Sequence, residues 1–183
     1  MTGRPWWGAP SRYNPPVRAL GLVHTKGDGV RIHIGADHAG FALKQSVKDH
    51  LVCSGHDVTD VGAFSEESVD YPVIAEKVGR AVADGEADRG VLVCGTGLGM
   101  AIAANKVNGV RAVQINTPAF AEMSRRHNDA NVVTLAGRSI GPDEAFPIVD
   151  AFLATDFEGD RHQRRVDQIS AIEAANPCTP PSV

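Results

Sequence analysis

The sequence is poor in cysteine, and its three cysteines stand far apart at positions 53, 94 and 178. They show no metal-ligand spacing and an odd number cannot all pair, which favours a reducing, cytoplasmic setting. Long apolar runs are also missing. The longest one near the start, residues 19–23, is too short for a signal-peptide core or a membrane span, and no other segment could cross a membrane. We therefore expect no cysteine-bound metal and no membrane contact.

Positive charge is not in excess either. The 18 Lys and Arg residues are outnumbered by 22 Asp and Glu residues, which gives a formal net charge of −4. Because broad nucleic-acid binding needs a clustered basic face, we expect no nucleic-acid partner. The length of 183 residues with 43% hydrophobic side chains fits one globular domain, which needs no metal or disulfide to hold its core.

Residues 1–29 differ from the rest of the chain. They contain both tryptophans, four of the 11 prolines and three arginines that precede the first acidic residue, Asp28. An acid-poor lead of this kind is also typical of a transit peptide, but it contains a single serine and no evident amphipathic helix. We expect a disordered extension at 1–29, a folded domain at 30–176 and a tail at 177–183.

Short apolar runs alternate with helical patterns from residue 30 onward, which predicts a doubly wound α/β sheet. The expected strands are five parallel ones at 31–36, 56–61, 90–94, 110–115 and 131–136. The expected helices include one marked by Leu43, Val47 and Leu51, followed by others at 71–83, 100–106, 117–126, 143–154 and 166–175. Pro147 should kink the helix at 143–154 or delay its start. The last helix follows no strand, so we expect it to pack on a partner subunit.

Reactive side chains follow two of the predicted strands, at the carboxyl edge where open α/β sheets bind ligands. Asp37 and His38 follow the first strand, and Cys94 ends the third. The glycine-rich residues 95–99 after Cys94 lead into a helix, where backbone N–H groups suit an anion. A dinucleotide fold also uses such loops, but this one follows the third strand, and no acid lies near twenty residues on.

A free cysteine is most often an inert core residue, but Cys94 faces a predicted helix N-terminus. Positive backbone potential there favours the thiolate, the form that acts as a base or nucleophile. Cys53, within a helix, and Cys178, in the tail, lack this setting, and we interpret both as structural.

Basic side chains mark three further positions. His127 lies in the polar segment 124–131, and histidine is the residue type there that suits acid–base chemistry, although cations that complement a helix dipole would explain the segment equally well. Arg138 follows the fifth strand. Arg161 and Arg165 are four residues apart on one helical face, a geometry suited to clamping a phosphate, whereas Arg164 should face solvent.

Six segments together identify a family. They are 35–40 (Gly-Ala-Asp-His-Ala-Gly), 69–72 (Val-Asp-Tyr-Pro), 94–99 (Cys-Gly-Thr-Gly-Leu-Gly), 103–106 (Ala-Ala-Asn-Lys), 126–131 (Arg-His-Asn-Asp-Ala-Asn) and 157–162 (Phe-Glu-Gly-Asp-Arg-His). In this order they resemble the type B ribose-5-phosphate isomerases, a family shared with allose- and galactose-6-phosphate isomerases. The resemblance covers about residues 30–175.

The resemblance implies a Rossmann-like, three-layer α/β/α sandwich without a dinucleotide. It also implies a homodimer or tetramer whose active site is shared between subunits, and interconversion of D-ribose 5-phosphate and D-ribulose 5-phosphate without metal or cofactor. Cys94 matches the base of the cysteine-bearing branch. Another branch carries a glutamate at the place of Met100, which cannot act as a base.

By the same resemblance, His127 with Asp37 opens the sugar ring, Cys94 moves a proton from C2 to C1 through a cis-enediolate, and Thr96 relays a hydroxyl proton. The expected phosphate ligands are His38, Arg138, Arg161 and Arg165. The expected contacts to the developing charge are the N–H groups of Gly95, Gly97, Leu98 and Gly99. Tyr71 and Asn128 should contact sugar hydroxyls.

One departure from the family is Asp160, where a second glycine is common, and we expect Asp160 to cap the last helix. Three alternatives stay open on the sequence. They are an isomerase of a six-carbon aldose 6-phosphate, a sugar-phosphate-binding module without catalysis, and a nucleotide-dependent oxidoreductase.

Overall fold

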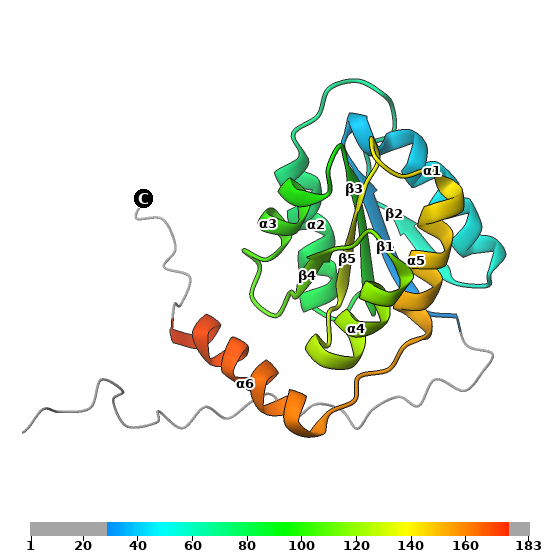
Figure 1. Ribbon diagram of the computed structural model, residues 1–183. Coiled ribbons are helices and arrows are strands. Elements are labelled where there is room, and N and C mark those ends of the chain that lie inside the picture. Colours follow the sequence, from blue (N-terminus) through cyan, green and yellow to red (C-terminus); the bar gives the residue numbers. More distant parts are fainter. Residues whose placement is uncertain (1–28, 176–183) are drawn as a thin grey trace, which may run out of the picture.

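A five-stranded parallel sheet forms the centre of the molecule, as the sequence predicts. The computed structural model describes residues 29–175, so all of the expected extension but its last residue lies outside the described residues, together with the tail. The strand order is β2-β1-β3-β5-β4 (Figure 1). The strands are β1 (Arg31–Ala36), β2 (Asp57–Asp60), β3 (Arg89–Cys94), β4 (Ala112–Gln114) and β5 (Val132–Ala136).

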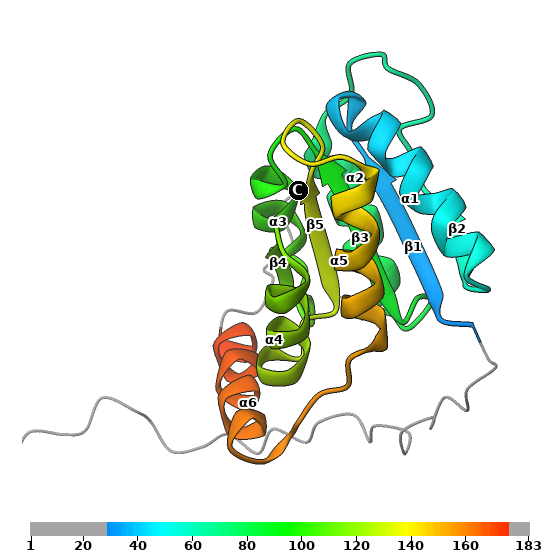
Figure 2. The same ribbon diagram turned by 45° about the vertical axis from the view of Figure 1, so that its right-hand side comes forward.

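Helices cover both faces of this sheet and make the expected three-layer α/β/α sandwich (Figures 1 and 2). The helices are α1 (Phe41–Cys53), α2 (Tyr71–Ala83), α3 (Leu98–Ala104), α4 (Pro118–Asn128), α5 (Pro142–Ala154) and α6 (Asp160–Ala175). Helices α1, α4 and α5 share one apolar core with the sheet, and α2 and α3 share the other.

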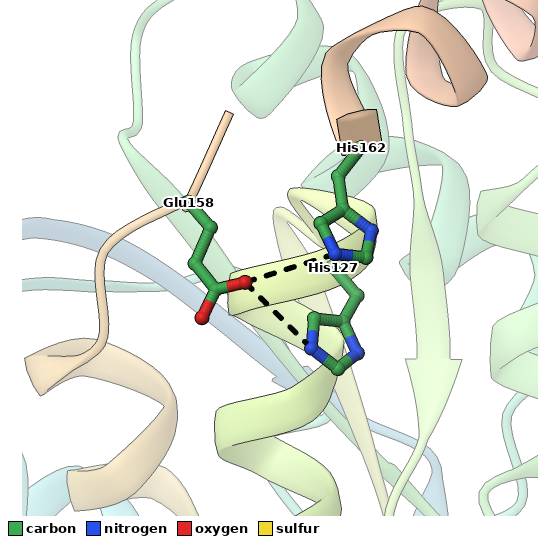
Figure 3. Close-up of side chains that lie close together, drawn as sticks. All are labelled: His127, Glu158 and His162. Carbon is green, nitrogen blue, oxygen red and sulfur yellow. Dashed lines mark ion pairs between the residues drawn. The ribbon is translucent and has the colours of Figure 1, made fainter. Parts of the chain in front are cut away.

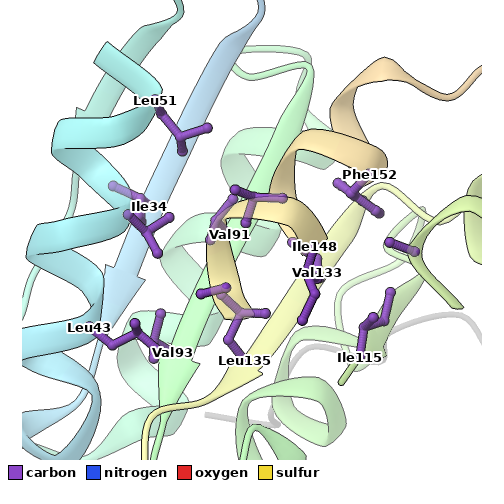
Figure 4. Packing of buried hydrophobic residues seen from close by; sticks show 14 of the residues in the cluster. Ile34, Leu43, Leu51, Val91, Val93, Ile115, Val133, Leu135, Ile148 and Phe152 are labelled. Carbon is purple, nitrogen blue, oxygen red and sulfur yellow. The ribbon is translucent and has the colours of Figure 1, made fainter. Parts of the chain in front are cut away.

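The alternation of side chains along β3 explains the two cores. Val91 and Val93 point into the α1–α5 layer (Figure 4), whereas Leu92 and Cys94 point into the α2–α3 layer. All four are buried, and burying an aliphatic side chain of this size contributes roughly 1.5–3 kcal/mol. The order of the strands therefore places Cys94 at the end of the central strand.

Two details of the helices differ from the sequence expectations. Helix α5 begins at Pro142 and runs through Pro147, so the expected delayed start is wrong. Helix α6 begins at Asp160 rather than 166, and the N–H groups of His162 and Gln163 donate to the carbonyl of Gly159. Asp160 is thus the first residue of the helix and not its cap.

Helix α6 extends from the bottom of the molecule beside α4, away from the carboxyl edge of the sheet (Figures 1 and 2). Only His162 and Val166 of its sixteen residues are buried. Among the described residues, none of the helices has the length and apolar character needed to cross a membrane.

Candidate active site

The carboxyl ends of β1, β3 and β5 meet around Cys94. The N–H of Asp37 donates to the Val93 carbonyl over 3.2 Å, and the N–H of Gly137 donates to the Cys94 carbonyl over 2.8 Å. The central strand thus fixes the loops that follow its two neighbours. These contacts bring together segments that are more than forty residues apart in the sequence.

The Cys94 thiol is held by the loop that follows it. The residue is 5% exposed, and the N–H of Gly97 donates to Sγ over 3.2 Å. This hydrogen bond fixes the position of the sulfur relative to the glycine loop. The expectation that Cys94 sits at a helix N-terminus is confirmed, because α3 begins one residue after Gly97.

The side chains of Arg138 and Tyr71 lie against the two ends of the glycine loop, residues 95–99. A Cβ atom at Gly95 would lie 3.3 Å from the Arg138 side chain, and one at Gly99 would lie 2.8 Å from the Tyr71 ring. Glycine therefore lets both side chains approach the backbone. Thr96 and Leu98 are exposed at the tip of the loop, where the Thr96 hydroxyl accepts a bond from the Leu98 N–H.

Asp37 and His38 lie in the turn after β1. The buried Asp37 carboxylate accepts a hydrogen bond from the Gly40 N–H over 3.0 Å and so caps the short helix His38–Gly40. The Nδ1 atom of His38 is buried and has no hydrogen-bond partner among the described residues. A buried polar atom without a partner is costly, which makes His38 a good candidate for contact with a ligand.

The other predicted site residues lie at the opposite edge of the sheet. His127 and Asn128 end α4, just before β5 begins, whereas Cys94 pairs with Ala136 at the end of β5. A strand rises about 3.3 Å per residue, so Val132 and Ala136 are about 13 Å apart. Arg161 and Arg165 are exposed on α6 in the neighbourhood of His127. One chain therefore does not bring all the predicted residues together.

His127 belongs to a cluster with two residues that the sequence reasoning did not place in the site, Glu158 and His162 (Figure 3). The rings of His127 and His162 stack with centroids 4.4 Å apart. The Oε2 atom of Glu158 lies 3.8 Å from Nε2 of His127 and 3.7 Å from Nε2 of His162. Both residues lie in segment 157–162, one of the six that resemble the family. That resemblance was the sequence signal that could have placed them in the site.

Arginines surround this cluster and set its charge. The Arg126 Nε atom donates to Glu158 Oε1 over 2.7 Å, and this bond holds the pKa of Glu158 below its usual value. Burial lowers the pKa of His162, and the charges of His127, Arg161 and Arg165 lower it further. The ligand atoms lie within 4.8 Å of one another, a spacing within reach of a metal ion. The surrounding positive charge disfavours a metal cation at this cluster.

Of the other two cysteines, the structure describes Cys53 alone. Cys53 is exposed at the end of α1, in a helix as expected, and its interpretation as structural stays a prediction. Cys178 lies outside the described residues.

Comparison with known proteins gives one consistent result. The family model for Ribose/Galactose Isomerase matches residues 32–169. The chain is 50% identical over 143 residues to ribose-5-phosphate isomerase B of Escherichia coli, which covers 78% of this chain and 96% of that protein. A ribose 5-phosphate isomerase structure from Thermotoga maritima has 51% identity and a TM-score of 0.76, covering 78% of this chain and 98% of that one. A Mycoplasma genitalium ribose-5-phosphate isomerase B with bound ribulose-5-phosphate has 41% identity and a TM-score of 0.75, with coverages of 78% and 95%.

Proposed function

The chain belongs to the ribose/galactose isomerase family, and we infer from this that it interconverts D-ribose 5-phosphate and D-ribulose 5-phosphate. The observation that carries the inference is the Cys94 thiol, held by a backbone N–H at the carboxyl edge of the sheet. Isomerisation of an aldose to a ketose moves one proton between neighbouring carbons and needs a single base in reach of both. The reaction is internal to the sugar, so it requires no redox cofactor.

Cys94 is the proposed base. Its thiolate removes the proton from C2 and returns it to C1, through a cis-enediolate. Met100, at the place where another branch of the family carries a glutamate, is fully buried and has no group that accepts a proton. The buried position of Cys94 also keeps water away from the sulfur. This favours proton transfer between the sulfur and the sugar carbons.

The glycine loop and its neighbours bind the rest of the substrate. Backbone N–H groups of Gly95 and Gly99 stabilise the negative charge that develops on the enediolate, and those of Gly97 and Leu98 join them by turning from the Cys94 sulfur and the Thr96 hydroxyl to which they donate in this structure. The exposed Thr96 hydroxyl relays a proton between the oxygens of the enediolate. Tyr71 contacts a sugar hydroxyl. Arg138, which covers Gly95, and His38, with its unpartnered Nδ1, bind the phosphate.

A second copy of the chain completes each site. Four of the proposed residues lie at the far edge of the sheet, so His127, Asn128, Arg161 and Arg165 of one subunit serve the Cys94 of its partner. His127, with Asp37 of the other subunit, opens the sugar ring, and the two arginines complete the phosphate site. Exposed apolar side chains on the adjoining helices support such an interface; they are Leu98 and Ile102 on α3, Phe120 and Met123 on α4, and Ile169 on α6.

The Cys94→Ala variant tests the proposed base. We expect its turnover of D-ribose 5-phosphate to fall by about 10² or more, because a positioned general base typically contributes that much. Binding of the sugar phosphate, measured by calorimetry, should persist. The matched control is Cys53→Ala, which removes an exposed thiol and should leave turnover unchanged. Normal turnover in Cys94→Ala would remove Cys94 from the mechanism.

A further inference from the structure

The cluster of His127, Glu158 and His162 contains two residues with no part in the proposed reaction. We propose that Glu158 is a positioning residue for His127: its carboxylate and the ring of His162 hold the His127 imidazole in the orientation that opens the sugar ring. This inference rests on the proposed function, because it takes His127 as the ring-opening residue.

Glu158 is fastened to the helix that carries His127. Its N–H donates to the Arg126 carbonyl over 3.1 Å, and its Oε1 accepts from Arg126 Nε over 2.7 Å. A second ion pair joins Oε1 to the Nη2 atom of the same arginine. Two fixed points on Arg126, the residue just before His127, leave the carboxylate little freedom. Its other oxygen, Oε2, is directed at the two imidazole rings (Figure 3).

His162 forms the platform on which His127 rests. Its side chain is 7% exposed, whereas that of His127 is 34% exposed, so the buried ring supports the accessible one. The rings are close to parallel, with 8° between their planes. Stacking restricts the rotation of the His127 ring about its own side-chain bonds, since a rotated ring would lose the contact.

The hydrogen bond to His162 sets the charge of the ring beneath His127. The Nε2 atom of His162 accepts a hydrogen bond from Arg161 Nε over 3.2 Å, so this nitrogen carries no proton. The ring beneath His127 is therefore neutral, and it does not repel a proton gained by His127. The Glu158 carboxylate, 3.8 Å away, stabilises the resulting imidazolium.

Ring opening can be separated from the later steps by the choice of substrate. Ribose 5-phosphate exists mainly as a furanose and must be opened. Ribulose 5-phosphate is open-chain, because its O5 carries the phosphate and no five-membered ring can form. Starting from the ketose, the enzyme releases an open-chain aldose that closes in solution. A residue that acts only through ring opening therefore affects the initial rate from the aldose and spares the rate from the ketose.

The test compares Glu158→Gln with the wild-type protein in both directions of the reaction. The enzyme concentration is high enough that conversion of the open-chain sugar is faster than spontaneous ring opening. We expect the initial rate from ribose 5-phosphate to fall about ten-fold or more, and the rate from ribulose 5-phosphate to change less than about two-fold. Glu158→Asp retains the charge and should recover part of the loss. The control is Glu76→Gln, which removes another carboxylate paired with an arginine, on the distant helix α2, and should change neither rate.

The outcomes separate the inference from the function on which it rests. Inactivity of the wild-type protein with both sugars would overturn the proposed function itself. An active wild type with equal losses from both sides in Glu158→Gln would assign Glu158 a purely structural role. Unchanged rates from both sides would remove it from the reaction, and either result overturns the inference.

Discussion

At the scale of single residues, Lys44 joins three parts of the chain beside the site. It lies on α1 and is fully buried. Its Nζ atom donates over 2.7 Å to both carboxylate oxygens of Asp60, at the end of β2, and to the carbonyl of Ala63 in the following loop. The N–H of Ala63 in turn donates to the Ala36 carbonyl, next to Asp37. Lys44 thus anchors the backbone next to Asp37, which is proposed to open the sugar ring together with His127.

We expect Lys44→Met to lower the free energy of unfolding by about 3 kcal/mol, because it leaves the half-buried Asp60 carboxylate without its buried partner. Urea unfolding followed by circular dichroism measures the change. The control is Lys48→Met. Lys48 reaches the same carboxylate over 3.4 Å but is 27% exposed, so its loss should cost less than about 1 kcal/mol. Equal effects of the two substitutions would contradict the role given to Lys44.

The residues that sequence reasoning found and missed differ in one physical respect. Cys94 ends a predicted strand and Asp37 follows one, and a strand end is visible in the local pattern. Lys44 and Glu158 gain their meaning from partners that the fold supplies, Asp60 in one case and the stacked rings of His127 and His162 in the other. Local patterns contain no information about such partners.

At the scale of elements, the loop between β3 and α3 depends on one glycine. Gly97 has a φ of 76°, its N–H donates to the Cys94 sulfur, and its carbonyl accepts from the Thr134 hydroxyl over 2.9 Å. A Cβ atom at this position would lie 2.8 Å from the Gln114 side chain and 3.2 Å from the Leu135 backbone. The loop would have to move to relieve these contacts.

We expect Gly97→Ala to reduce turnover of ribose 5-phosphate at least about ten-fold, because the displaced loop no longer holds the thiolate and the enediolate. Gly85→Ala is the matched control. Gly85 has a similar φ of 78° but open space around its Cα. Both substitutions should lose about 1–2 kcal/mol of stability from the left-handed backbone, measured by thermal unfolding. Full turnover in Gly97→Ala would show that the geometry of the loop is not required.

Element boundaries are also predicted well where the local sequence marks them, and poorly where contacts made in the fold set them. The strand at 31–36 and the helix at 71–83 match the structure to the residue, because periodicity and Pro72 mark them locally. The helix expected at 100–106 instead spans Leu98–Ala104. It stops there because the Asn105 side chain pairs with the backbone of Ala112, donating to its carbonyl and accepting from its N–H over 2.8 Å. The early start of α6 was missed because its first turn is polar and lacks an apolar period.

At the scale of the whole molecule, the two halves of the site are separated by the sheet. His127 precedes β5 and Cys94 lies beside its end, and this order follows from the topology of any parallel sheet. The groove of about 470 Å³ between α6 and β4 is lined in part by Ile169 and Val113, which leaves apolar surface on the same side as His127. The proposed assembly of two copies would account for both the separated site residues and the uncovered helix α6.

Mixing two inactive variants tests this assembly directly. Cys94→Ala and His127→Asn should each be inactive alone on ribose 5-phosphate, because every site in either homodimer lacks one essential group. After subunit exchange, a mixed dimer has one site with both groups intact and one with neither. Random pairing in equal amounts makes half of the dimers mixed, so about a quarter of wild-type activity should return. Cys94→Ala mixed with Cys94→Ser is the control and should regain nothing. Exchange is verified by mass spectrometry of an isotope-labelled subunit, and absence of activity in a mixture that has exchanged would show that each chain contains its own complete site.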